Sequence, residues 1–343
     1  MSATIYMETY GLSLRKSGNC FKISGEDDKK QEIPAFSIGS VVVSADGVSI
    51  SGGAVRLCQE NDIPIFFLPV NGGQTSVLAP VECRSPELQA AQIRAQEESA
   101  RIHALAQGFV QGKIGNQLNL AKYFKNSRGL KTGEYADSLG EYADTVADIL
   151  SGSGMEPDTD DISLMRNRLF SAEGRAASAY WHMVSLLIPQ DMEFPGRTRK
   201  GAKDAVNCML NYGYAILATR VHQALLHAGF STYFSFLHSP RPGRASLIYD
   251  LMEEFRPWAV DRVVIGMCGK GRKVKTDGNG KLKTEDRRFL IQSLEKRWAA
   301  DNLRKLLANQ AEVLSRAVME KKPYVPVKFL SSGAVQAGTA QSS

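Results

Sequence analysis

The sequence predicts an α+β protein of two domains, a small N-terminal β domain followed by a larger all-α domain. Residues 1–78 contain short runs rich in β-branched and aromatic residues, separated by turn residues, which is typical of strands. From residue 88 onward, apolar residues recur at helical spacing over long stretches. A chain of 343 residues is long enough to bury a core in each domain.

Composition limits the class of protein. Hydrophobic residues make up 43% and charged residues 23%, as in an ordinary globular protein. The formal net charge of +6 is compatible with a polyanionic partner. The five cysteines are scattered and include no Cys-x-x-Cys pair, which argues against a zinc ribbon or a disulfide framework. We expect a cytoplasmic protein, because there is no signal-peptide core and no apolar run of about 20 residues.

The N-terminal β domain is expected to hold strands, one helix and a hairpin. Strands are predicted over Thr4–Met7, Cys20–Ser24, Ile38–Val43, Pro64–Leu68 and Thr75–Leu78. Ala54–Asn61 is predicted to be helical, and Asn71-Gly72-Gly73 predicts a hairpin turn before the last strand. The domain contains no catalytic constellation. Residues 79–87 include two prolines and are predicted to be a linker.

The helical domain is expected over residues 88–322. Helices are predicted over Leu88–Phe124, from an Asp160 or Asp161 cap to about Ile188, over Val206–Ala228 and over Phe289–Met319. Breaks are predicted at Ser127–Thr132 and Ser151–Asp158. Residues 323–343 are expected to be a disordered tail, because Ser331–Ser343 is mostly Gly, Ala, Gln and Ser.

A histidine and an acidic helix face come close together in Gly229–Pro257. An apolar run ends on His238, a six-residue loop follows, and apolar residues then recur at helical spacing from Ser246. The opposite side of that helix carries three carboxylates, those of Asp250, Glu253 and Glu254. Histidine with clustered carboxylates is a ligand set for a divalent cation. The alternative is a solvated acidic face beside a core histidine.

A fourth acidic residue, Glu173, lies at the edge of a buried stripe on the helix that ends near Ile188. A carboxylate in that position costs free energy unless it is paired or binds a metal. The alternative is a rim glutamate that pairs with Arg166 or Arg175. The residues alone leave both interpretations open.

Three basic segments are candidates for phosphate contacts. Their candidate residues are Arg197, Arg199 and Lys200 in one loop, Arg241 and Arg244 beside the acidic helix, and Lys273 and Lys275 on one arm of a predicted hairpin. The hairpin has its tip at Asp277-Gly278-Asn279-Gly280, and a merely solvated hairpin is an equal alternative. Asn207 and Asn211 lie four residues apart on one helix face, where they could reach a phosphate, order the site or form a polar rim.

Three strings in the helical domain resemble a known family, the CRISPR-associated integrase Cas1. FLHSPRPGRASLIYDLMEEFRP resembles its active-site signature, RLFSAEGRAASAYW its glutamate-bearing helix, and DAVNCMLNYGYAIL the helix before its metal histidine. The resemblance covers almost the whole chain and is strongest at residues 166–257. It implies a metal-dependent DNA endonuclease and integrase that inserts short DNA fragments into a CRISPR array. It also implies a homodimer through the N-terminal β domain, with double-stranded DNA (prespacer and CRISPR repeat) and the small protein Cas2 as partners.

The resemblance also implies roles for individual residues. Glu173, His238 and Glu253 match the ligands of one Mg²⁺ or Mn²⁺. Asp250 matches a further catalytic residue, expected to order a metal-bound water or to help deprotonate the nucleophile.

Helix geometry alone does not choose between Glu253 and Glu254, which lie about 60° and about 40° around the helix from Asp250. The family pattern, acid-x-x-acid, selects Glu253. Glu254 is then expected on the helix flank, paired with Arg256 or with the basic loop. A non-catalytic nucleic-acid scaffold, an unrelated hydrolase of small phosphoesters and a transposon-borne integrase remain alternatives.

Overall fold

The structure, a computed structural model, describes residues 3–25, 31–68, 75–79, 84–151, 160–277, 279–336 and 338. It divides into two compact units, Met1–Cys83 and Arg84–Ser343. The predicted order of a β-sheet region followed by a helical region is confirmed. Within the described residues, no helix is long and apolar enough to cross a membrane.

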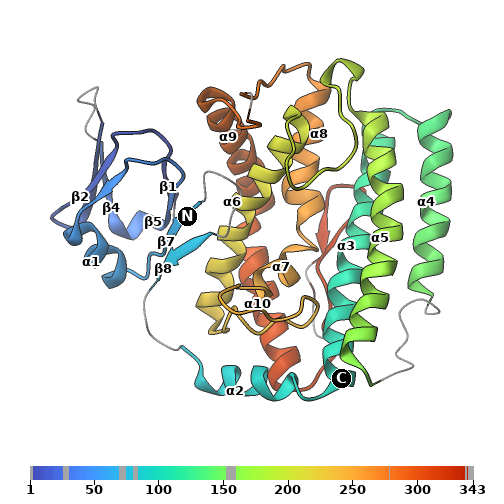
Figure 1. Ribbon diagram of the computed structural model, residues 1–343, viewed down its shortest axis with the longest axis horizontal. Coiled ribbons are helices and arrows are strands. Elements are labelled where there is room, and N and C mark those ends of the chain that lie inside the picture. Colours follow the sequence, from blue (N-terminus) through green and yellow to red (C-terminus); the bar gives the residue numbers. More distant parts are fainter. Residues whose placement is uncertain are drawn as a thin grey trace. The chain divides into compact units, whose positions relative to one another are not determined.

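The N-terminal unit contains two four-stranded sheets (Figure 1). The first has the order β1 (Ala3–Met7), β5 (Ile38–Val43), β7 (Ile65–Phe67) and β8 (Ser76–Leu78), with β8 antiparallel to β7 and the other pairs parallel. The second has the order β4 (Gln31–Pro34), β3 (Cys20–Ser24), β2 (Ser13–Ser17) and β6 (Ser49–Ile50), with only the β2–β6 pair parallel. Helix α1 (Gly52–Glu60) begins after Ser51, whose hydroxyl accepts a hydrogen bond from the Ala54 amide.

All five predicted strands of this unit are present, but β2, β4 and β6 were not predicted. Strand β2 reads Ser-Leu-Arg-Lys-Ser and buries only Leu14 fully, so its alternation is too weak to recognise. Leu14 packs with Met7, Phe21 and Val41 in the core that the two sheets share with α1. The predicted hairpin turn at residues 71–73 lies outside the described residues.

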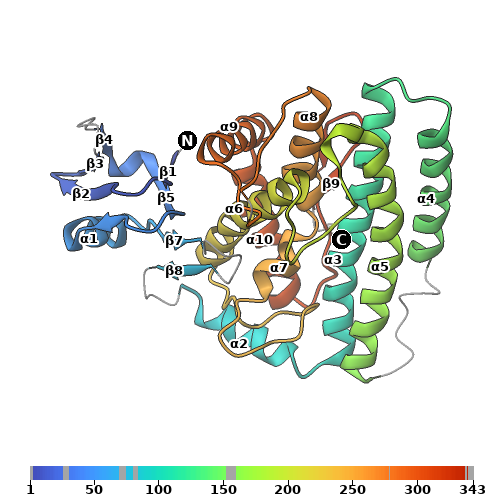
Figure 2. The same cartoon turned by 45° about the horizontal axis from the view of Figure 1, so that its top comes forward.

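The helical unit is built mainly from nine α-helices in the described residues. They are α2 (Pro86–Ala95), α3 (Ser99–Ser127), α4 (Glu134–Leu150), α5 (Ile162–Leu187), α6 (Ala205–Ala228), α7 (Leu247–Met252), α8 (Arg262–Gly269), α9 (Thr284–Asp301) and α10 (Leu303–Met319). Short turns η1 (Ala35–Ser37), in the N-terminal unit, and η2 (Gln190–Met192) are 3₁₀-helical, and η3 (Pro257–Asp261) is a π-helical turn. In Figures 1 and 2, α3, α4 and α5 lie side by side, and the short α7 contacts both α3 and α6.

Two long predicted helices are each interrupted. The helix expected over Leu88–Phe124 is split into α2 and α3 between residues 95 and 99. The helix expected over Phe289–Met319 breaks at Asn302, which has a left-handed backbone (φ 52°) of the kind that asparagine tolerates at helix ends. Asp161 caps α5, since its Oδ1 accepts from the Ser163 amide at 2.7 Å and the Leu164 amide at 3.2 Å.

The expectation of a disordered tail from residue 323 is wrong for residues 323–336. Tyr324, Val327 and Phe329 are buried in the helical unit, and β9 (Lys328–Phe329) pairs with β10 (Val335–Gln336). We call residues 324–329 the C-terminal strap. Gly112 of α3 permits its close approach, because a Cβ there would lie 2.6 Å from Cβ of Pro326. The strap was missed because its apolar residues follow no helical or strand period.

Candidate functional site

The three acidic residues in and directly after α7 are buried rather than solvated. The exposed fractions of Asp250, Glu253 and Glu254 are 0%, 4% and 0%. The apolar face packs as predicted, with Leu251 and Phe255 fully buried. A solvated acidic face is therefore excluded, and each of the three carboxylates needs a partner inside the protein.

Both carboxylate oxygens of Asp250 are hydrogen-bonded to the segment that ends in His238. Its Oδ2 accepts from the Phe236 amide at 2.7 Å and the Leu237 amide at 3.0 Å. Its Oδ1 accepts from the His238 amide at 3.1 Å and lies 2.7 Å from His238 Nδ1. Four donors therefore converge on the two oxygens of Asp250, and its expected role at a metal-bound water or at the nucleophile stays a prediction. In the structure, Asp250 holds both the backbone amide and the ring of His238.

His238 is fixed in orientation and in tautomer. Because a carboxylate faces Nδ1, that nitrogen carries the proton and Nε2 of the neutral ring keeps its lone pair. The ring lies 5.6 Å, centroid to centroid, from Phe170, one turn before Glu173 on α5. Burial lowers the pKa of His238, but the hydrogen bond and charge of Asp250, with the charges of Glu253 and Glu173, raise it above its usual value overall.

Glu173 and Glu253 meet at one buried ammonium group, that of Lys113. Lys113 Nζ contacts Glu173 Oε1 and lies 2.6 Å from Glu253 Oε2. The partners anticipated for Glu173 are engaged elsewhere, because Arg166 Nε donates to the Phe236 carbonyl at 3.0 Å and Arg175 pairs with Asp148 at 3.6 Å. Helices α3 and α5 and the turn that follows α7 thus bring their charges to one point.

The sequence interpretation missed Lys113. The residue lies on the buried side of α3, four residues after Phe109 and next to Ile114. A lysine on an apolar helix face is itself a signal, because a buried ammonium group costs several kcal/mol unless it is paired.

Arg256 provides a second cation to Glu253, at 3.1 Å from Oε1. Burial raises the pKa of Glu253, but the charges of Arg256 and Lys113 hold that pKa well below its usual range. Glu253 is therefore a carboxylate at any physiological pH. Arg256 also stacks on Tyr214, 4.7 Å from the ring centroid, and Tyr214 donates to Asp261 in η3. Burial raises the pKa of Asp261 to about 6.

Glu254 does not lie on an open flank and does not pair with Arg256 or the basic loop, so that expectation is wrong. It faces the C-terminal strap, where Oε1 accepts from the Tyr324 hydroxyl at 2.5 Å and Oε2 accepts from the Val327 amide at 2.9 Å. Burial raises its pKa to about 8. The amide of Asn116, on α3, completes this junction by donating to the carbonyls of Glu254 and Val327.

Arg197 is part of the fold rather than a free phosphate-binding side chain. Its guanidinium donates to Oδ1 of Asn207 at 3.0 Å and of Asn211 at 2.7 Å, and it stacks on Tyr214. The two asparagine amides donate to the carbonyls of Gly196 and Arg199, so they order the loop that carries Arg197.

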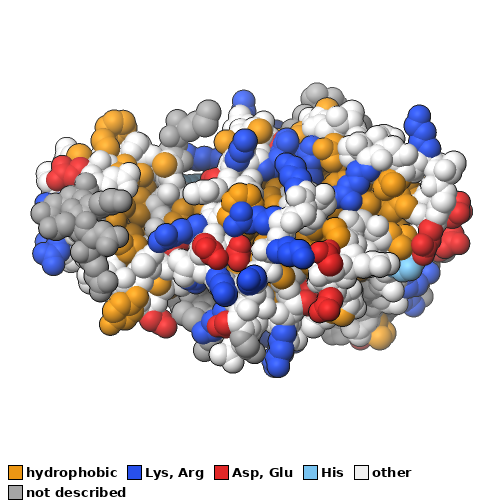
Figure 3. All heavy atoms as spheres, turned by 90° about the horizontal axis from the view of Figure 1, so that it is seen from above, with side chains coloured by type: hydrophobic (Ala, Val, Ile, Leu, Met, Phe, Trp, Pro, Cys, Tyr) orange, Lys and Arg blue, Asp and Glu red, His pale blue; other side chains and the backbone are white. Residues whose placement is uncertain are grey.

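The remaining basic candidates lie at the surface. Arg199, Lys200, Arg241, Lys273 and Lys275 are exposed, and Arg244 is half-buried with its guanidinium 5.0 Å from the Tyr249 ring centroid. Lys273 also lies 3.5 Å from Asp191. Where the hairpin is predicted, Thr276 and Leu282 form a single isolated antiparallel bridge, and Gly278 of the predicted tip lies outside the described residues. Figure 3, the molecule seen from above, shows basic side chains interspersed with acidic ones rather than a continuous basic band.

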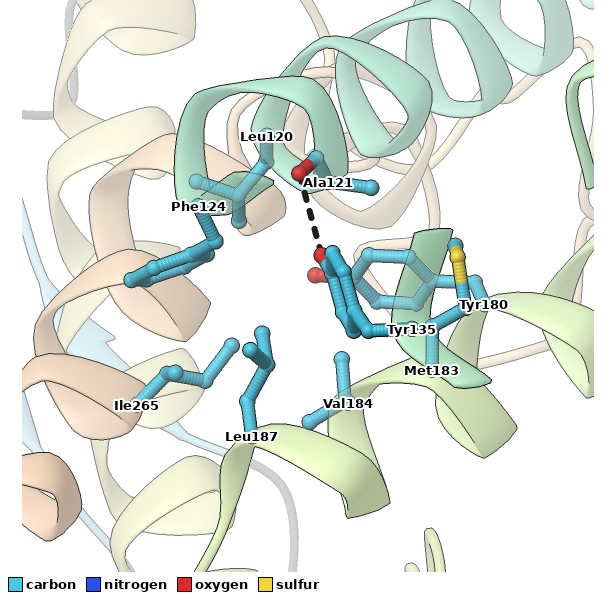
Figure 4. Close-up of a pocket in the computed structure, with 9 residues that line it drawn as sticks. All are labelled: Leu120, Ala121, Phe124, Tyr135, Tyr180, Met183, Val184, Leu187 and Ile265. Atoms are coloured by element: carbon cyan, nitrogen blue, oxygen red, sulfur yellow. Dashed lines mark hydrogen bonds between the residues drawn. The ribbon is translucent and has the colours of Figure 1, made fainter. Parts of the chain in front are cut away.

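An apolar cavity between α3, α4, α5 and α8 is separate from this site. Figure 4 shows its lining, which includes Phe124, Tyr135, Met183 and Ile265. The Tyr135 hydroxyl donates to the Ala121 carbonyl at 3.0 Å and the Tyr180 hydroxyl donates to Asp261 at 2.8 Å, so both hydroxyls in Figure 4 are satisfied. The cavity has no room for a water molecule and is a packing defect of the core rather than a ligand site.

The carboxylates that meet at Lys113, together with His238, are of the types that can hold Mg²⁺ or Mn²⁺. Among the described residues, no three carboxylate, imidazole or thiol groups form a ready-made ligand cluster. However, two glutamates already converge on a cation, and a histidine presents an unprotonated Nε2 nearby. Glu253 Oε2 is buried, and the contact that the structure gives it is the ion pair with Lys113 Nζ at 2.6 Å. Carboxylate oxygens with one imidazole fit such a metal.

The fold and this site define a class of protein. It is an α+β protein of two units, and in its helical unit two glutamates contact one buried lysine while an aspartate holds a histidine. The chain belongs to the family of CRISPR associated protein Cas1, whose model matches residues 5–296. It is 32% identical over 299 residues to CRISPR-associated endonuclease Cas1 1 of Archaeoglobus fulgidus, covering 83% of each chain. It is 30% identical over 326 residues to CRISPR-associated endonuclease Cas1 1 of Pyrobaculum aerophilum, covering 94% of this chain and 98% of the relative.

Solved structures share the fold. A casposase bound to integration product superposes with a TM-score of 0.76 at 19% identity, covering 100% of this chain and 96% of that one. A Cas1 protein from Thermotoga maritima superposes with a TM-score of 0.75 at 19% identity, covering 92% and 97%. The Cas6-RT-Cas1–Cas2 complex gives a TM-score of 0.75 at 20% identity, with 99% of this chain matched to 36% of that one.

Proposed function

We propose that this protein is the divalent-metal-dependent DNA endonuclease and integrase of CRISPR adaptation, which inserts short DNA fragments into a CRISPR array. The observation that carries the proposal is the convergence of Glu173 and Glu253 on one cation beside the Asp250-supported His238, in a chain of the Cas1 family. The curated relatives are named endonucleases, which supports cleavage of phosphodiesters.

Glu173, His238 Nε2 and Glu253 would hold one Mg²⁺ or Mn²⁺. When bound, such a metal polarises the scissile phosphate and stabilises the leaving oxygen. Asp250 keeps the proton on Nδ1 of His238, so that Nε2 stays available. Arg256 keeps Glu253 ionised and in place. A 3′-hydroxyl as nucleophile gives integration and water gives cleavage, so one site serves both reactions.

DNA would be bound by exposed basic residues through its phosphates, which requires no sequence readout. The candidates are Arg199, Lys200, Arg241, Arg244, Lys273 and Lys275. One solved relative is described as a Cas1–DNA complex, which supports DNA as partner. Arg197 supports this surface indirectly, since it orders the loop that carries Arg199 and Lys200.

Homodimerisation through the N-terminal unit and assembly with Cas2 belong to the same proposal. Two large aromatic side chains of that unit stand in solvent, with Phe36 85% and Tyr10 74% exposed, which favours a protein partner there. A structural neighbour is described as a Cas1–Cas2 complex. The four described cysteines are free thiols, in keeping with a reducing compartment such as the cytoplasm.

The test is strand transfer of a labelled duplex into a plasmid that carries a CRISPR array, with and without Cas2 and with and without Mn²⁺. The expected result is insertion at the array that requires metal. DNA binding without metal-dependent strand cutting would instead identify a non-catalytic scaffold. Salt-insensitive hydrolysis of small phosphoesters would identify an unrelated hydrolase.

A transposon-borne integrase is the second candidate, favoured by the fold similarity to the casposase. That neighbour shares 19% of its residues with this chain, against 32% for the Archaeoglobus endonuclease. Insertion of a long DNA with defined ends, without preference for the array, would favour this candidate.

A further inference from the structure

Lys113 occupies a buried position on α3 where an apolar side chain would ordinarily be expected. It lies in the middle of α3, 5% exposed, among residues that bury apolar side chains. Methionine would fill the same position without a charge to desolvate. The ammonium group of Lys113 contacts Glu173 of α5 and Glu253, which directly follows α7. The charge therefore serves the two glutamates that meet there.

An ammonium group and a metal ion cannot share this position. Lys113 Nζ lies 2.6 Å from Glu253 Oε2 and contacts Glu173 Oε1. A Mg²⁺ ion on the same oxygens would lie about 2.0–2.1 Å from each. Two cations bridging the same pair of oxygens would overlap and repel, so the ammonium must move before the metal enters.

We propose that Lys113 is a built-in counter-ion that occupies the metal position and competes with the metal for Glu173 and Glu253. This inference rests on the proposed function, because it assumes that the two glutamates are metal ligands. In the metal-free protein, Lys113 holds together two carboxylates, the buried one of Glu253 and the partly buried one of Glu173, that would otherwise repel each other. On metal binding its long, flexible side chain swings away and leaves a preorganised pair of ligands behind.

If Lys113 competes with the metal, replacing it should raise the affinity of the protein for Mn²⁺. Removing the lysine removes a competitor, so Lys113→Met should bind Mn²⁺ about tenfold more tightly or better, even though a residue of the site has been lost. The same variant should unfold at a lower temperature without metal and gain more stability from saturating Mn²⁺ than the wild type does. A purely structural lysine would change stability and leave the affinity unchanged or weakened.

The experiment is calorimetric titration of the full chain with Mn²⁺, together with thermal unfolding with and without the metal. Lys122→Met is the matched control, because Lys122 lies on the same helix with an exposed side chain. It should behave as the wild type does. Tighter binding by Lys113→Met alone supports the proposal.

Three other outcomes are decisive. If the wild type binds Mn²⁺ and Lys113→Met binds it equally or more weakly, the metal site stands and the role of Lys113 is wrong. If neither protein binds Mn²⁺, the metal site fails and the inference fails with it. If Lys113→Met does not fold, Lys113→Arg decides: a guanidinium bridges two carboxylates more firmly, so Mn²⁺ affinity should fall about tenfold, and unchanged or tighter binding overturns the proposal.

Discussion

Nδ1 of His238 lies 2.7 Å from Oδ1 of Asp250, a carboxylate with no exposed surface. Because Asp250 occupies Nδ1, Nε2 is the imidazole nitrogen that is left for a metal. The three acidic residues in and after α7 have different partners. Asp250 holds the histidine, Glu253 faces Lys113, and Glu254 holds the C-terminal strap.

Substituting any of the three proposed ligands should abolish function without unfolding the protein. Glu173→Ala, His238→Ala and Glu253→Ala are each expected to lower strand transfer more than about 100-fold and to weaken Mn²⁺ binding, because each removes a group that holds the Lewis acid. Strand-transfer assays, calorimetry and circular dichroism on the three variants measure this. A variant that keeps wild-type activity removes its residue from the ligand set.

Asp250→Asn should be impaired through structure. An asparagine has one carbonyl oxygen where four donors converge on two carboxylate oxygens, and each buried donor left unsatisfied costs about 1–3 kcal/mol. We expect a loss of roughly 2–5 kcal/mol in the free energy of unfolding, measured in urea, together with weaker Mn²⁺ binding. Asp148→Asn, at an exposed surface pair, is the control. Unchanged stability with lost activity would restore Asp250 to a direct catalytic role.

Metal affinity should depend on pH through His238. A metal-bound imidazole must be unprotonated, and the acidic surroundings raise the pKa of His238 above its usual value near 6.5. Mn²⁺ affinity should therefore rise with pH through a midpoint above about 6.5, a higher window than that of a free histidine. Calorimetric titrations at a series of pH values test this, and an affinity that is flat across the series would exclude His238 as a ligand.

Stability should depend on pH through Glu254. Its folded-state pKa is raised to about 8, so between the unfolded value of about 4.3 and that pKa the folded protein holds a proton that the unfolded chain has lost. The contribution of this residue to stability therefore falls as pH rises through this window, by up to about 1.4 kcal/mol per pH unit. Glu254→Gln cannot ionise, and urea unfolding from pH 6 to 9 should show a flatter profile than the wild type. Parallel profiles would contradict the assignment.

DNA binding should weaken steeply with salt, in part through the hairpin. Replacing Lys273 and Lys275 with alanine should flatten the dependence of log affinity on log salt by up to about 1.8, because each phosphate contact contributes about 0.9. Mn²⁺ binding should not change. The control is the double alanine variant of Lys321 and Lys322, two other exposed lysines. An unchanged slope would assign the hairpin to solvent or to a protein partner.

Helical periodicity predicted much of the site, because it reports which residues share a face of one helix. It placed Asp250 beside Glu253 and marked Glu173 at the edge of a buried stripe. The loop length correctly brought His238 back over α7. These relations are local, and the spacing of residues along the chain determines them.

Periodicity could not assign partners that come from other helices. Glu253 and Glu254 are adjacent in sequence, and only packing against α3 and the C-terminal strap gives one a lysine and the other a tyrosine. The same holds for Arg197, which has the composition of a phosphate ligand but lies over Tyr214 and two asparagines.

The C-terminal strap bears on the order in which this protein can fold during its synthesis. The Phe329 amide donates to the Asn116 side chain across 213 residues of sequence. At about 5–20 residues per second, a ribosome needs roughly 10–40 s to make that stretch. Helix α3 is completed early in this interval and α7 is made before it ends, but until the strap is made the buried amide of Asn116 and then the carboxyl of Glu254 lack their final partners. The helical unit completes its interior only when the strap emerges, so the nascent chain must be kept from aggregating until the strap has been made.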